Sequence, residues 1–184
     1  GSDTEPPARA WAETADLTAA LRDPAIAGRT ALHEIGSGRR LTFAALDTAV
    51  QATAEGLLGV AGVEPGERVA LMVPPGLDLS IALYACWRMG AVPVLIDGGL
   101  GPRQMSAAMR VADPDHLIGI PRALAAARAL RWPGRRMSID PLPRATRRLL
   151  DVQHDLSTLR AERTATLLPT IDPGAEAAVV FTSG

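Results

Sequence analysis

The 184-residue sequence contains no lysine and no asparagine, and it has few aromatic residues and a single cysteine. All 19 basic residues are therefore arginine, which excludes Schiff-base chemistry and a lysine clamp on phosphate within these residues. The six aromatic side chains are too few to predict a stacking surface for nucleic-acid bases. Because Cys86 is alone, an internal disulfide framework is excluded, and a reducing compartment, the cytoplasm, is expected.

A strong charge of one sign is also absent, since 19 arginines and 20 acids give a net charge of −1. This balance predicts no nucleic-acid partner. The longest apolar stretch, residues 77–100, is interrupted by charged residues, glycine and proline, so it does not resemble a membrane span of ~20 apolar residues. No signal-peptide pattern is visible, and Gly1 and Ser2 are interpreted as a cloning scar. The hydrophobic content of 47% is typical of a folded domain, and the length favours one.

Short apolar runs alternate with helical patterns through the middle of the chain. Runs of strand length begin near residues 69, 92 and 116, and each interval of 23 or 24 residues holds one predicted helix. This alternation predicts an α/β fold, with a mostly parallel sheet and right-handed crossover helices on both faces. The predicted strands are 69–73, 91–96, 116–120, 137–139 and 177–181. The predicted helices between them are 77–89, 103–112 and 121–130.

The flanking regions give weaker patterns. A helix is predicted over residues 11–21 and a short strand over 31–35. Thr42 is a predicted N-cap for a long amphipathic helix, whose apolar positions repeat every three or four residues from Phe43 to Leu58. Residues 140–172 look irregular, apart from one predicted helix at 156–163.

The last four residues carry the chemistry that stands out. The buried strand 177–181 runs directly into Thr182, Ser183 and Gly184. Small residues let the backbone approach an anion, while hydroxyls and successive N–H groups donate to phosphate oxygens. A strand followed by Thr-Ser-Gly therefore suggests the start of a phosphate-binding loop, although Ser-Gly after a strand is more often a simple turn.

Four stretches, in order along the chain, resemble motifs of the ATP-dependent acyl-adenylating superfamily of acyl-CoA synthetases, luciferases and adenylation domains. LTFAAL at residues 41–46 resembles the family's LTYxEL, and VEPGERVA at 63–70 resembles GVxPGDxV. Residues 85–97, centred on MGAVPV, resemble LxxGAxxVP, and FTSG at 181–184 looks like the opening of YTSGTTGxPKG. GAVPVLID at 90–97, with IGIPR at 118–122, is more similar to fatty-acyl ligases and olefin-pathway β-lactone synthetases.

The resemblance implies an enzyme that activates a carboxylic acid, with a fatty acid as the expected class, using ATP and Mg²⁺, and passes the acyl group to CoA or another thiol. In the β-lactone branch, a hydroxyl of the same substrate closes a ring instead. Thr182, Ser183 and Gly184 would be partial ATP-phosphate ligands. The rest of the loop, the metal-binding Glu and the catalytic Lys of relatives find no match here. We therefore expect residues 3–184 to be a partial N-terminal adenylating domain, truncated in its phosphate loop, with no catalytic residue and no activity alone. A non-catalytic α/β binding module is the alternative.

Other candidate residues have simpler interpretations. Asp97 follows a predicted strand, at the edge where open α/β sheets bind ligands, but a turn residue before two glycines is the favoured interpretation. His33, His116 and His154 lack metal-ligand spacing, so no metal site is predicted. Cys86 lies in a predicted buried helix and is interpreted as a core residue rather than a nucleophile.

Arginines are concentrated in residues 122–148, where eight of them accompany the single acid Asp140, giving a net charge of +7. A solvated surface is the favoured interpretation. A surface facing CoA or a carrier domain, both anionic, is a second possibility, and a nucleic-acid patch is a third, with only Trp132 interleaved. The arginines are 122, 128, 131, 135, 136, 144, 147 and 148.

Overall fold

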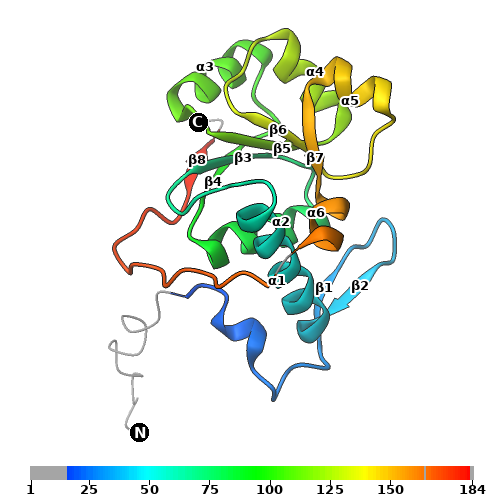
Figure 1. Ribbon diagram of the computed structural model, residues 1–184, viewed down its shortest axis with the longest axis vertical. Coiled ribbons are helices and arrows are strands. Elements are labelled where there is room, and N and C mark those ends of the chain that lie inside the picture. Colours follow the sequence, from blue (N-terminus) through cyan, green and yellow to red (C-terminus); the bar gives the residue numbers. More distant parts are fainter. Residues whose placement is uncertain (1–15, 164, 183–184) are drawn as a thin grey trace, which may run out of the picture.

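A six-stranded, fully parallel sheet forms the centre of the protein (Figure 1). The structure is a computed structural model that describes residues 16–163 and 165–182. The strands lie in the order β7-β6-β5-β3-β4-β8. Their bounds are β3 (Arg68–Met72), β4 (Val92–Ile96), β5 (His116–Gly119), β6 (Arg135–Ser138), β7 (Val152–Asp155) and β8 (Val179–Phe181).

The chain reverses direction across the sheet after β4. It passes from β3 to β4 through α2 (Leu77–Met89), and then returns past β3 to β5 through α3 (Pro102–Ala112). Right-handed crossovers in opposite directions place their helices on opposite faces. Figure 1 accordingly shows α3, α4 (Pro121–Ala129) and α5 (Arg144–Leu150) on one face. On the other face lie α2, α1 (Phe43–Gly59) and α6 (Leu156–Glu162). The predicted α/β fold is confirmed.

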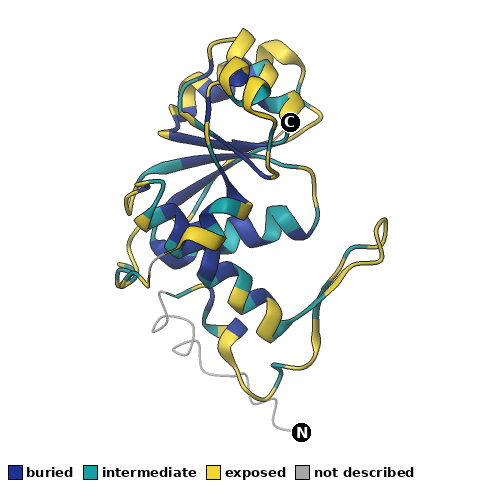
Figure 2. Cartoon of the chain, turned by 45° about the vertical axis from the view of Figure 1, so that its right-hand side comes forward, coloured by how far each residue is buried: buried dark blue, intermediate teal, exposed yellow. Residues whose placement is uncertain are grey.

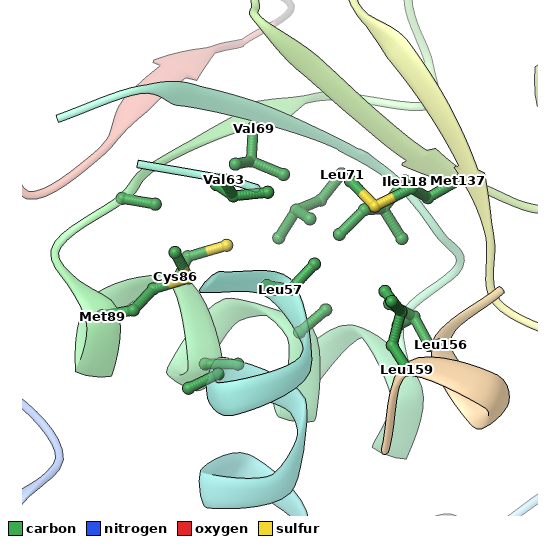
Figure 3. Packing of buried hydrophobic residues seen from close by; sticks show 14 of the residues in the cluster. Leu57, Val63, Val69, Leu71, Cys86, Met89, Ile118, Met137, Leu156 and Leu159 are labelled. Carbon is green, nitrogen blue, oxygen red and sulfur yellow. The ribbon is translucent and has the colours of Figure 1, made fainter. Parts of the chain in front are cut away.

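Alternate strand residues enter two separate cores, because successive side chains of a strand point to opposite faces. Val69 and Leu71 of β3 pack with the α1, α2 and α6 side chains shown in Figure 3. Ala70, between them, belongs to the cluster beneath α3 and α4. Burial of both faces explains why the strand sequences read as continuous apolar runs.

The predicted start of α1 and the predicted end of α2 are confirmed by their capping geometry. The Thr42 hydroxyl oxygen accepts a hydrogen bond from the Ala45 backbone N–H at 3.2 Å, which caps α1. Gly90 ends α2 with φ +79°, a left-handed conformation that glycine adopts without strain. The predicted apolar face of α1 is buried at Leu46, Val50 and Leu57.

The contact between α1 and α6 depends on a glycine. A Cβ atom at Gly56 would lie 2.5 Å from the backbone oxygen of Leu159 and 2.9 Å from its Cβ. Gly56 therefore allows the two helices to approach more closely than any side chain would permit.

The N-terminal predictions need correction. The strand β1 is Thr30–His33 rather than 31–35, and it pairs antiparallel with β2 (Arg40–Thr42), which the sequence analysis did not identify. Ile35 lies in the connecting turn with 88% of its surface exposed. Of the helix predicted over 11–21, residues 11–15 lie outside the described residues, and the remainder contains only the start of a 3₁₀ helix, η2 (Ala19–Arg22).

The expectation of irregular structure over residues 140–172 was wrong in its first half. The segment contains α5 and the edge strand β7 before α6. The two elements are short, and β7, with the sequence VQHD, has three polar residues among its four. From Arg163 to Ala178 the described residues contain no helix or strand, and this connection is fastened where the Trp87 indole N–H donates to the Ala177 oxygen at 2.6 Å. No helix in the described part is long and apolar enough to cross a membrane.

Candidate functional site

A cavity of about 890 Å³ opens at the carboxyl edge of the parallel sheet. It lies where the connection after β3 leads to one face of the sheet and those after β4 and β5 lead to the other. Reversals of this kind create the crevice in which open α/β sheets bind ligands. Most of the lining is apolar, including Met72, Leu79, Ile96, Met105, Trp132 and Phe181.

The strand β8 delivers Thr182 to the rim of this cavity. Phe181 pairs with Ile96 of β4, and its carbonyl oxygen accepts the Asp97 N–H at 3.0 Å. Thr182, which follows directly, is exposed and lines the cavity. The strand predicted over residues 177–181 is shorter, since β8 covers only Val179–Phe181, and it is not buried as expected, because 58% of Val180 is exposed. Ser183 and Gly184 lie outside the described residues.

Asp97 is both a turn residue and a residue of the cavity lining, the two roles that the sequence suggested for it. One of its carboxylate oxygens accepts the Gly99 N–H at 2.9 Å, which stabilises the turn after β4 as the sequence suggested. The residue also lines the cavity, next to the end of β8. Asp97 and Thr182 thus lie on neighbouring strands at one end of the site.

Arg122 is the cavity residue that sequence reasoning missed, because it was grouped with the surface arginines. It is exposed, it lines the cavity beside the end of β5, and no carboxylate among the described residues forms an ion pair with it. β5 is three strand positions from β8, so its end lies roughly 14 Å from that of β8 at ~4.8 Å per strand. The signal was available, since Arg122 follows a predicted strand just as Asp97 does.

Trp132 does not belong to a nucleic-acid surface. Its side chain is buried, with 4% exposed, and its indole N–H donates to the Ser106 hydroxyl oxygen at 2.9 Å. The ring lines the cavity from the inside of the α3–α4 layer. The aromatic residue among the arginines of 122–148 is therefore part of the core. A nucleic-acid patch on this segment would have no exposed Trp132 ring for bases to stack on.

The cysteine and histidines lie apart from the cavity lining. Burial raises the pKa of the Cys86 thiol to about 12, and the residue packs in the core of α2, as predicted. His116 is buried with its Nε2 atom 2.8 Å from the Glu67 Oε2, while His33 lies in β1 and His154 in β7. No group of three or more His, Cys, Asp or Glu residues with metal-binding geometry occurs within residues 16–163 and 165–182.

Two curated proteins illustrate the sequence similarity of the chain. It is 39% identical over 92 residues to an olefin β-lactone synthetase from Xanthomonas campestris pv. campestris, an alignment that covers 50% of this chain and 16% of that enzyme. It is 36% identical over 88 residues to an acetyl-coenzyme A synthetase from Streptomyces coelicolor, covering 46% of this chain and 13% of that one. The chain thus spans well under a quarter of the length of either relative.

A solved structure and a family model extend the match to most of the chain. The crystal structure of a coronafacic acid ligase from Pectobacterium brasiliense superposes with a TM-score of 0.73 at 18% identity, covering 85% of this chain and 31% of the ligase. That similarity shows a shared fold. The family model described as AMP-binding enzyme matches residues 19–184, from the first short helix through the Thr-Ser-Gly sequence after β8. The chain therefore belongs to the AMP-binding enzyme family.

Proposed function

We propose that this chain supplies the phosphate-loop side of an ATP-dependent site that converts a carboxylic acid into an acyl-adenylate. The observation that supports this most directly is the position of Thr182. It leaves β8 at the rim of the cavity, in the part of the chain that the family model matches. Residues 3–184 would form the N-terminal part of the adenylating domain, and the phosphate loop would begin at Thr182.

The cavity suggests an apolar acid as the substrate. Its volume of about 890 Å³ falls in the range of small-molecule sites, roughly 300–1,000 Å³. Methionine and aromatic side chains provide a lining that adapts to flexible chains. A fatty acid is the class of acid that this lining favours.

In the proposed reaction, the carboxylate of the acid attacks the α-phosphate of ATP, and pyrophosphate leaves. The Thr182 hydroxyl and the N–H groups of Ser183 and Gly184 would donate hydrogen bonds to phosphate oxygens and hold them in place. Mg²⁺ is expected to come with the ATP phosphates and neutralise their charge. CoA is the proposed acceptor of the acyl group. The 184 residues alone are expected to show no turnover.

The proposal can be tested by replacing Thr182 in the complete gene product. Hydroxylamine trapping of the acyl-adenylate, with a panel of fatty acids, measures the adenylation step. Thr182→Ala should slow it about 10- to 100-fold, because a hydrogen bond to a charged group contributes about 1.5–3 kcal/mol. Thr48→Ala, an exposed position on α1, is the matched control and should leave the rate unchanged. Equal rates for the two variants would contradict a phosphate-binding role for Thr182.

A β-lactone synthetase is the second candidate, and the similarity to an olefin β-lactone synthetase favours it. Product analysis with a β-hydroxy fatty acid separates the two. A lactone formed without CoA would support ring closure, whereas a thioester formed only with CoA would support the thiol ligase. If no acid gives an acyl-adenylate, the remaining interpretation is a non-catalytic α/β binding module. A cytoplasmic location also belongs to this proposal, supported by the free thiol of Cys86.

A further inference from the structure

A basic surface lies at the end of the α4–α5 layer. Four exposed arginines and two leucines lie around the ends of α4 and α5 and the start of β6, and α4 packs against both α5 and β6. Both leucines are unusually open to solvent, with 46% of Leu130 and 72% of Leu149 exposed. We call this surface the basic corner, and its residues are Arg128, Leu130, Arg131, Arg135, Arg148 and Leu149.

The positive charge of the basic corner is not paired with acids in the part of the chain that the structure describes. None of its four guanidinium groups forms an ion pair with a carboxylate of the described residues. The nearby acid Asp151 is already paired with Arg136, whose Nη1 lies 3.0 Å from its Oδ2. Residues 122–148, which include the corner, have a net charge of +7, whereas the rest of the chain has −8. An anionic surface would therefore attract this segment more strongly than the rest of the chain.

The corner is part of a protruding end of the molecule. In Figure 1 the α3, α4 and α5 helices form one extremity along the longest axis, and Figure 2 shows that their outer sides are largely exposed. The cavity meets α4 at its other end, at Arg122, about 13 Å away along a helix of nine residues.

We propose that the basic corner binds the surface of an anionic lipid bilayer. Arginines at such a surface are attracted by the headgroups, and the two leucines can enter the boundary between headgroups and acyl chains. A protein partner fits the corner less well. The two leucines lie at separate helix ends, and the cavity that could receive a partner's side chain lies at the opposite end of α4. A nucleic acid is disfavoured because Trp132 is buried. This inference does not depend on the adenylation chemistry.

Vesicle sedimentation with the 184-residue protein tests the proposal. Vesicles of phosphatidylcholine with about 30% phosphatidylglycerol are compared with vesicles of phosphatidylcholine alone. Each is measured at low salt and at about 0.5 M NaCl. The variant Arg128→Gln, Arg131→Gln, Arg148→Gln should bind the anionic vesicles about 100-fold more weakly, at roughly fivefold for each arginine. A second variant, Leu149→Ser, should lose the fraction of binding that persists at high salt.

The control variant removes the same charge elsewhere, through three exposed arginines of the hairpin region and α3: Arg29→Gln, Arg40→Gln and Arg103→Gln. It should bind as the unmodified protein does. Equal losses in both triple variants would overturn the proposal, because net charge alone would then govern binding. Absence of binding to anionic vesicles, or binding to poly-glutamate without binding to vesicles, would overturn it as well, the latter outcome pointing to an acidic protein partner.

Discussion

Replacing Gly56 by alanine should destabilise the protein, although the same change in most helices is stabilising. Gly56 lies inside α1, fully covered by α6. In a helix interior, alanine is favoured over glycine by about 1 kcal/mol, because glycine loses more backbone freedom on folding. Here the added Cβ would be only 2.5 Å from the Leu159 backbone oxygen.

The size of the destabilisation depends on which atom the new Cβ would approach. A side chain could rotate away from the new Cβ, but a backbone carbonyl can move only if α6 shifts as a whole. Overpacking of a core costs about 1–3 kcal/mol, and a rigid neighbour places this site near the upper value. After the gain of about 1 kcal/mol in helix propensity is subtracted, the free energy of unfolding should fall by about 2 kcal/mol.

Urea unfolding followed by circular dichroism measures this change. With an m-value of about 2 kcal/mol/M, the Gly56→Ala midpoint should fall by about 1 M at an unchanged slope. Thr48→Ala, at an exposed site of the same helix, should raise the midpoint slightly. Leu159→Ala should not rescue Gly56→Ala, since the closest atoms belong to the backbone. A Gly56→Ala protein as stable as the unmodified one would refute the argument from close helix approach.

Three further perturbations have expected outcomes. Thr42→Ala should lower the free energy of unfolding by about 1 kcal/mol, because α1 loses its N-cap, and denaturant melting measures this. Cys86 should react with a disulfide reagent at neutral pH only when urea unfolds the protein, since burial raises the thiol pKa to about 12; rapid reaction of the native protein would contradict its burial. Burial raises the pKa of Asp155, but hydrogen bonds from Ser157 and Thr158 outweigh this effect and hold it below the ordinary 3.8. Its stabilising contribution is therefore present above pH 4 and lost as the pH falls through the lowered pKa, so Asp155→Asn should flatten the acid limb of a stability–pH profile.

The parallel core was predictable because burial on both faces leaves a strong mark on the sequence. The helix 77–89 was predicted to the residue, and strands β3, β4 and β5 to within one residue at each end. Pro93 was a mild objection to β4, and the register explains why it is tolerated. β8 pairs with β4 only from Val94 onward, so the missing N–H of Pro93 lies outside that ladder.

The elements that the sequence did not predict are those held by tertiary contacts rather than by local patterns. β2 is three residues long, and β7 is an edge strand with three polar residues among its four, so neither produces a hydrophobic period. The site was partly predictable for a similar reason. Thr182 stands out because of the residues around it, whereas Arg122, although it follows a predicted strand, was hidden among the other arginines of residues 122–148.

The attachment of β8 has a consequence for the order in which the site is assembled. Val179 pairs with Val94, 85 residues earlier in the chain, and β8 contacts one other strand through three residues. Such a long-range, small element is expected to dock late in folding and to open locally before the rest of the sheet does. A ligand held by Thr182 would then bind only the closed form, and its binding energy would stabilise the edge of the sheet. Hydrogen exchange at Val180 and Phe181 should therefore slow when nucleotide binds, while exchange in β3 stays the same.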